Sequence, residues 1–177
     1  ARMEVIRGSE FFEWDAGEAQ RLYGHVVPSA PGIRYTVLRE PAGIVAGFAP
    51  WNFPLSQPAR KIAGALASGC SIILKSAEET PAGAMHIARA FQDAGLPAGV
   101  LNLVFGNPSE ISSYLIPQAQ VRLVAFTGST AVGRKIRQAT AGTGKALTLE
   151  LGGKSPYVVF DDADIDRALD AVIFMIY

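Results

Sequence analysis

Short apolar segments alternate along this chain with longer segments of helical spacing, and this alternation restricts the possible folds more than any other feature. Several of the apolar segments are hydrophobic on both faces, as strands are when helices cover both sides of a parallel sheet. The pattern predicts an α/β fold with right-handed crossovers, in which an open, mostly parallel sheet carries helices on both faces. The predicted strands are residues 44–49, 71–75, 100–105, 122–127, 146–151 and 157–160.

Further elements are predicted around this alternation. One helix begins at Thr80 and Pro81, where threonine can cap a helix and proline can occupy its first position. Residues 9–23 are predicted to form a leading helix, residues 35–40 an exposed strand, and the segment from Ala163 an acidic-capped helix. Ligands bind at the carboxyl ends of the strands in such sheets, so candidate site residues are sought there.

The composition excludes several functional classes. With 177 residues, of which 49% are hydrophobic and 18% charged, the chain can bury one core, so a single domain is expected. Sixteen basic and sixteen acidic residues cancel, and no basic cluster is present to bind nucleic acid or an anionic membrane. No apolar run approaches the roughly 20 residues that cross a bilayer. We therefore expect a soluble protein whose partners are small molecules or other protein chains.

The few cysteine and histidine residues exclude other kinds of site. A single cysteine, Cys70, allows no internal disulfide, and His25 and His86 are too far apart in sequence to suggest a metal cluster. Cys70 lies between a glycine and an apolar strand, which favours a buried core residue over a nucleophile. The expected location is the reducing cytosol.

A glycine-rich junction lies where the strand at residues 122–127 ends. Gly128 closes the strand and a helix begins directly after it, so that free backbone N–H groups and the positive end of the helix dipole would face a pyrophosphate. The junction is not a phosphate loop, because Arg134 and Lys135 follow Gly133 in place of lysine and a hydroxyl residue. The dinucleotide fingerprint with three glycines is also absent.

Two other strand ends carry polar side chains. Lys75 and Glu78 could grip the hydroxyls of a ribose, since a carboxylate can accept from both; the alternative is a solvated ion pair on a loop. Asn52 lies between two prolines in PWNFP and could donate its amide to an oxyanion. The alternative for this segment is an ordinary turn with a buried tryptophan.

Glu150 is the acid of the segment TLELGGKSP. Because strand residues alternate, it faces away from Leu149 and Leu151, near the end of its strand and beside glycines that let a ligand approach. A carboxylate there, partly removed from water, suits a general base that works near neutral pH.

Four segments in order, PWNFP, KSAEETP, FTGSTAVG and ELGGKSP, resemble the aldehyde dehydrogenase superfamily, and the resemblance covers the chain from Glu40 onward. It implies a Rossmann-like cofactor domain. It also implies a role for each matching residue: Asn52 in the oxyanion hole, Glu150 as the base that activates water, Lys61 in a proton relay, Lys75 and Glu78 on the adenosine ribose, Gly128 and Ser129 beside the pyrophosphate, and Trp51 with the backbone of Leu151 beside the nicotinamide.

The resemblance further implies oxidation of an aldehyde through a cysteine thioester, although no cysteine of this chain matches the nucleophile. We therefore expect a fragment: residues 1–177 as most of an NAD-binding domain, with residues 33–40 from an oligomerisation hairpin and the cysteine-bearing catalytic domain absent. A homodimer or homotetramer is implied for the full-length protein. The alternative is a stand-alone nucleotide-binding or assembly module without catalysis.

The cofactor and the substrate class follow from smaller features. The carboxylate of Glu78 would repel the 2′-phosphate of NADP, so NAD is the expected cofactor. The segment VFGNPSEIS resembles semialdehyde-oxidising members of the family.

Overall fold

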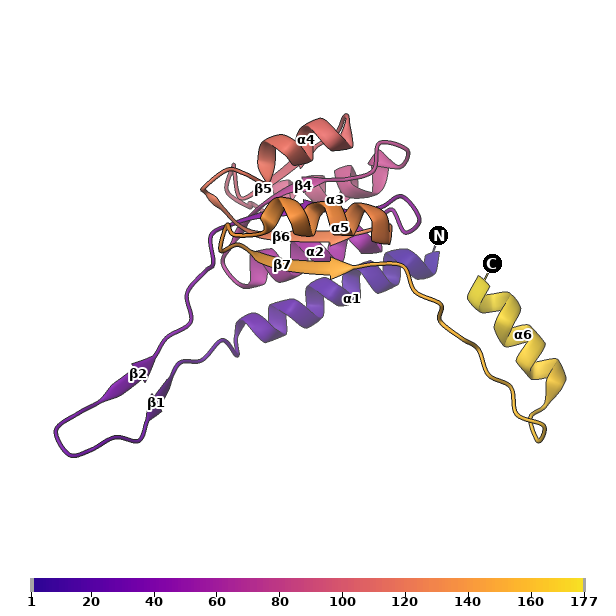
Figure 1. Cartoon of the computed structure of the whole chain (residues 1–177), viewed down its shortest axis with the longest axis horizontal. Coiled ribbons are helices and arrows are strands. Elements are labelled where there is room, and N and C mark those ends of the chain that lie inside the picture. Colours follow the sequence, from indigo (N-terminus) through magenta and orange to yellow (C-terminus); the bar gives the residue numbers. More distant parts are fainter. Residues whose placement is uncertain (1, 177) are drawn as a thin grey trace.

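The computed structural model describes residues 2–176, and its centre is a five-stranded sheet with the strand order β5-β4-β3-β6-β7. Every neighbouring pair in this sheet is parallel, which confirms the predicted α/β fold (Figure 1). The sheet strands are β3 (Ile44–Phe48), β4 (Ser71–Lys75), β5 (Leu101–Val104), β6 (Val121–Thr127) and β7 (Ala146–Glu150). The helices are α1 (Arg2–Ala19), α2 (Ser56–Ala67), α3 (Pro81–Asp93), α4 (Pro108–Leu115), α5 (Thr130–Thr140) and α6 (Ile165–Ile176).

Two cores form on opposite faces of the sheet because side chains alternate along each strand. In β3, Val45 belongs to the core that α1, α2 and α3 cover, whereas Ala46 and Phe48 belong to the core under α4 and α5. The largest fully buried side chains include Ile62 of α2 and Val124 of β6. The helices therefore cover both faces, as the apolar pattern of the strands predicts.

The order of the strands places a topological switch beside β3. From β3 the chain continues to β4 and β5 on one side of the sheet, and then returns to form β6 and β7 on the other side. The carboxyl ends of β3 and β6 therefore lie at the switch point, which is where open α/β sheets bind their ligands.

Two parts of the chain extend away from the sheet (Figure 1). Strands β1 (His25–Val27) and β2 (Tyr35–Val37) form an antiparallel hairpin whose residues are all exposed. The predicted strand at residues 35–40 is therefore shorter, and its partner β1 was not predicted. Beyond β7, residues 151–164 lead to α6.

Several sequence predictions are wrong in detail. Residues 157–160 do not form a strand, because no strand within residues 2–176 pairs with them and their side chains stay exposed. The leading helix begins at Arg2 and ends at Ala19, not at residues 9 and 23. Thr80 precedes α3, but its side chain forms no capping hydrogen bond. Cys70 is buried, as predicted.

Among residues 2–176, no helix combines the length and the apolar character that a bilayer crossing requires.

Candidate functional site

The four motif segments meet at one edge of the sheet. Each follows the carboxyl end of a parallel strand: residues 51–54 after β3, residues 76–78 after β4, residues 128–129 after β6 and residues 151–153 after β7. The register aligns these ends, since Phe48 of β3 pairs with both Lys75 and Phe126, and Thr127 pairs with Glu150. Residues far apart in the sequence are thereby brought into one row.

The loop after β3 packs against the start of α3. A Cβ atom on Gly83 would lie 2.2 Å from the backbone oxygen of Pro54, so only glycine allows this approach. The Thr80 hydroxyl also donates to the Trp51 carbonyl, at 3.5 Å. Trp51 itself is 61% exposed, which rules out a turn built around a buried tryptophan, and Asn52 is exposed beside it.

The junction after β6 is joined to the end of β7. The amide of Gly128 donates to the carbonyl of Glu150 at 3.0 Å, and a Cβ atom on Gly133 would lie 2.4 Å from the Leu151 Cδ2 atom. Ser129 is the N-cap of α5, where its hydroxyl oxygen accepts from the amide of Val132 at 3.3 Å. That hydroxyl can still donate its own proton to an anion at the N-terminus of α5.

A second group of polar side chains lies at the ends of β6 and β7 and consists of Lys61, Thr127 and Glu150. The Lys61 ammonium donates from Nζ to the Thr127 hydroxyl oxygen at 2.7 Å, and Thr127 is the register partner of Glu150. Burial lowers the pKa of Lys61 from its usual 10.5 to about 8; the Glu150 carboxylate opposes this effect and Arg60 adds to it. The site thus holds an amine that titrates near neutral pH beside a carboxylate.

Glu150 has the predicted orientation but not the predicted environment. Exposure alternates along β7, so that Leu147 and Leu149 face the core while Thr148 and Glu150 face the opposite side. Glu150 is exposed, whereas we expected it to be partly removed from water. The core on this face of the sheet includes no side chain of β7, so Glu150 at the sheet edge stays open to water.

Lys75 and Glu78 form an ion pair at the end of β4. The Lys75 side chain is only 7% exposed and its ammonium donates to the Glu78 carboxylate, which remains 43% exposed. The hydrogen bond from Lys75 lowers the pKa of Glu78, so this carboxylate stays ionised at neutral pH. A buried lysine does not fit the alternative of a solvated loop pair, and the outward carboxylate is available to a ligand.

A groove between α4 and α5 was missed by the sequence analysis. Its volume is about 330 Å³, and its walls combine apolar side chains with serine hydroxyls and one lysine. It adjoins the α5 N-cap, because Val132 both lines the groove and bonds to Ser129. The missed signal was Asn107-Pro108, a cap and first position of α4. The residues that line the groove are Pro108, Ser109, Ser112, Ser113, Ile116, Val132, Lys135, Ile136 and Ala139.

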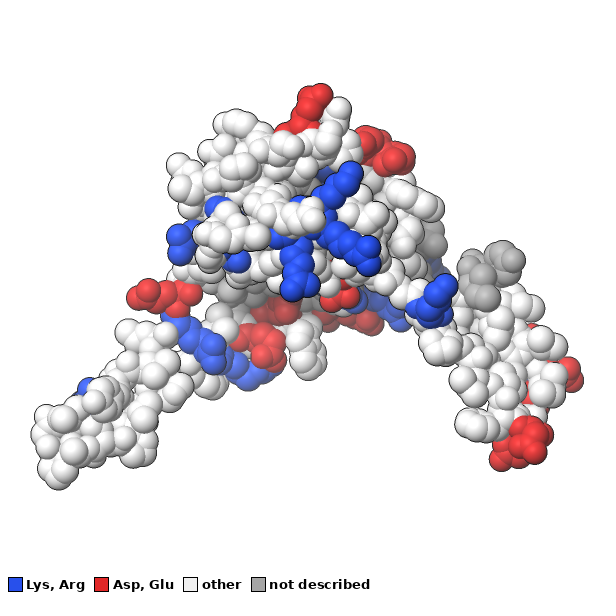
Figure 2. Space-filling view, in the orientation of Figure 1, with Lys and Arg blue, Asp and Glu red and all other residues white. Residues whose placement is uncertain are grey.

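The surface charge favours an anionic ligand on this side of the molecule. Figure 2 shows basic side chains gathered around α5, a helix that carries Arg134, Lys135 and Arg137 and has no acid in its first turn. Among residues 2–176, no three His, Cys, Asp or Glu side chains are grouped so that they could hold a metal ion.

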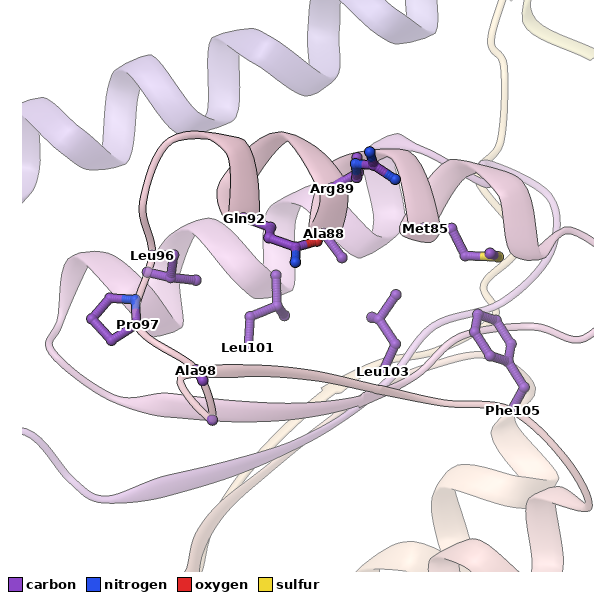
Figure 3. Close-up of a pocket in the computed structure, with 11 residues that line it drawn as sticks. Met85, Ala88, Arg89, Gln92, Leu96, Pro97, Ala98, Leu101, Leu103 and Phe105 are labelled. Atoms are coloured by element: carbon purple, nitrogen blue, oxygen red, sulfur yellow. The ribbon is translucent and has the colours of Figure 1, made fainter.

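A larger cavity, of about 650 Å³, lies at the other edge of the sheet between α3 and β5 (Figure 3). Met85 and Arg89 of α3 border it on one side, and Leu101 and Leu103 of β5 border it on the other. No motif residue lines it, and its one charged residue, Arg89, pairs with Asp93 at 3.5 Å. The smaller groove beside the motif row is therefore the better candidate for a ligand.

Comparison with known proteins gives a consistent result. The model of the aldehyde dehydrogenase family matches residues 1–177. A mitochondrial succinate-semialdehyde dehydrogenase of Oryza sativa subsp. japonica is 47% identical over 96% of this chain and 32% of its own length. Succinate-semialdehyde dehydrogenase [NADP(+)] 1 of Schizosaccharomyces pombe is 43% identical over 98% of this chain and 35% of its own length.

A solved structure has the same arrangement of elements. The crystal structure of an aldehyde dehydrogenase from Brucella melitensis biovar abortus 2308 superposes with a TM-score of 0.94 and 45% identity, over 98% of this chain and 36% of that one. The chain thus spans about a third of the length of the proteins it matches.

Proposed function

Because the chain belongs to the aldehyde dehydrogenase family, we propose that residues 1–177 form most of the cofactor-binding domain of an enzyme that oxidises a semialdehyde to a carboxylic acid with NAD. The observation that carries the proposal is the row of motif residues along one sheet edge, with the Lys75–Glu78 pair at β4 and the Lys61–Thr127 contact beside Glu150 at β7. The α5 N-terminus and the α4/α5 groove adjoin the same row.

The residues present suit a nicotinamide dinucleotide. Glu78 would accept from the hydroxyls of the adenosine ribose, and the N-terminus of α5 with Ser129 would hold the pyrophosphate. The apolar part of the α4/α5 groove would take the adenine, while Trp51 and Leu151 would border the nicotinamide. When bound, the cofactor accepts the hydride that leaves the aldehyde carbon.

The catalytic residues of this chain would act on the carbonyl and on water. We place the nucleophilic cysteine outside residues 1–177; its thiolate adds to the aldehyde carbon, and the Asn52 amide donates to the oxygen that becomes negative. Glu150 then takes a proton from water, the hydroxide oxygen attacks the thioester carbon, and the thiolate leaves. Lys61 would carry that proton onward, since its pKa of about 8 lets it exchange protons near neutral pH.

Assembly and location are part of the same proposal. The β1–β2 hairpin exposes Val26, Tyr35 and Val37, and it would form the contact of a homodimer or homotetramer. A cytosolic location is consistent with the single, buried cysteine.

The proposal is tested with the purified full-length polypeptide and succinate semialdehyde. We expect NADH to form in step with succinate, measured by absorbance and by mass spectrometry of the acid. NAD binding without oxidation of any aldehyde would instead favour a nucleotide-binding module, as would an intact mass that matches 177 residues.

The choice between NAD and NADP is predicted to depend on Glu78. Its carboxylate is ionised and faces outward, so we expect the dissociation constant of NADP to exceed that of NAD about tenfold or more. Glu78→Ser should weaken NAD binding and strengthen NADP binding, as measured by calorimetric titration. The control is Glu79→Ser, which changes an exposed neighbouring carboxylate and should leave both constants unchanged. Equal constants in the wild type would refute the preference.

Lys61 is predicted to lower the free energy of unfolding and to raise kcat. Its pKa is about 8 in the folded state against 10.5 in its usual environment, so the unfolded state binds more protons between these values and the free energy of unfolding rises with pH through this window. Lys61→Met should therefore raise the free energy of unfolding at pH 7, by about 1 to 3 kcal/mol, and flatten its rise above pH 8.

The same substitution should lower kcat, because the proton leaving Glu150 loses its acceptor. Unfolding is followed by circular dichroism at pH 7 and 9.5, with Lys154→Met, an exposed lysine, as the control. If Lys61→Met had a lower free energy of unfolding than the wild type at pH 7, burial of the Lys61 ammonium would not be destabilising.

A further inference from the structure

Helix α2 begins without a capping side chain of its own. Leu55 occupies the N-cap position, where an apolar residue cannot accept from the free amides of the first turn. The start of this helix nevertheless matters for the site, because α2 carries Lys61 and follows directly on the loop that presents Asn52.

Glu4 of α1 supplies the missing acceptor from a distant part of the sequence. One oxygen of its carboxylate, Oε1, accepts from the amide of Leu55 at 2.9 Å and from the amide of Ser56 at 3.1 Å. The Ser56 hydroxyl lies 3.4 Å from the same oxygen. A carboxylate here also interacts favourably with the positive end of the α2 dipole.

With Glu4 in place, all backbone amides at the start of α2 have partners. Gln57 donates to the carbonyl of Phe53 and Ala59 donates to that of Leu55, while Pro54 and Pro58 have no amide proton. The Glu4 carboxylate is thus the only side chain among residues 2–176 that completes this turn.

The packing of α1 on α2 holds Glu4 at this point. Gly8, one turn after Glu4, is buried, and a Cβ atom there would lie 2.3 Å from the Leu55 Cδ2 atom. The missing side chain lets Leu55 pack directly on α1, which fixes the distance between the two helices at the position of the carboxylate. Glu4 is partly buried, whereas Glu10 on the same helix is exposed.

We propose that Glu4 is a positioning residue for Asn52. Asn52 lies three residues before Leu55, and asparagine readily caps a nearby amide when no other acceptor is present. Because Glu4 already satisfies Leu55 and Ser56, the Asn52 side chain remains exposed and forms no hydrogen bond to any described residue. Glu4 thereby keeps the loop at residues 51–55 in one conformation and leaves the Asn52 amide free for the aldehyde oxygen. The catalytic part of this inference rests on the proposed function.

The test compares Glu4→Ala, Glu4→Gln and the control Glu10→Gln in the full-length polypeptide. Hydrogen–deuterium exchange reports the cap without any activity: Glu4→Ala should speed exchange at Leu55 and Ser56, Glu4→Gln should stay closer to the wild type because its amide oxygen can still accept, and Glu10→Gln should match the wild type.

Steady-state kinetics report the positioning role. We expect kcat for the aldehyde to fall about tenfold to a hundredfold in Glu4→Ala, with partial rescue in Glu4→Gln and an unchanged dissociation constant for NAD. Faster exchange with an unchanged kcat would overturn the positioning role, and unchanged exchange would overturn the cap itself. A wild type without aldehyde oxidation would refute the proposed function and the catalytic part of this inference, while the exchange rates would still decide whether Glu4 caps α2.

Discussion

Glu150→Gln in the full-length polypeptide is expected to slow hydrolysis of the acyl intermediate by about 10²- to 10⁴-fold. The amide cannot take the proton from water, whereas addition of the thiolate and loss of the hydride do not require Glu150. Formation of NADH should therefore keep its initial burst, followed by a much slower steady state, when it is observed by stopped-flow absorbance.

The control for this experiment is Asp162→Asn, which removes an exposed carboxylate from residues 151–164, between β7 and α6. It should leave both the burst and the steady state unchanged. If Glu150→Gln kept its steady-state turnover with an unaltered burst, Glu150 would not be the group that activates water.

Asn52→Ala is expected to produce the second large effect, in the steps that form NADH before the acyl intermediate is hydrolysed. Loss of one donor to a developing oxyanion lowers rates by about 10²- to 10³-fold, so the burst itself should slow. Because Asn52 is exposed and its side chain bonds to no described residue, the melting temperature should not change. Measurement of the burst rate and of the melting temperature together separates loss of a catalytic donor from loss of structure; a normal burst rate would contradict the role.

The sheet could be predicted well because its strands are specified by local pattern. Residues 71–75 were predicted with both bounds correct; β3, β6 and β7 differ from the prediction by one residue at one end, and β5 by one residue at each end. The central strands β3, β4 and β6 hold most of the buried residues of the sheet, so that their apolar runs carry the signal directly. Residues 157–160 have the same kind of apolar run without a partner strand, and sequence pattern alone cannot show whether a partner exists.

The sequence predicted individual residues of the site, but not the contacts between residues that are far apart in the chain. Lys75 and Glu78 are three residues apart and their pairing follows from spacing, but the contact between Lys61 and Thr127 joins α2 to the end of β6 and depends on the order of the strands. The α4/α5 groove was missed for the same reason, because two helices separated by a whole strand form its walls. Glu4 carries no local signal at all, since the amides it binds are more than fifty residues away.

The start of α5 and the end of β7 are joined to each other. The Gly128 amide donates to the Glu150 carbonyl, and Leu151 packs against Gly133. A ligand held at the start of α5 would therefore also bear on the backbone at Glu150 and Leu151. The same ligand would therefore act on the strand end from which the proposed general base extends.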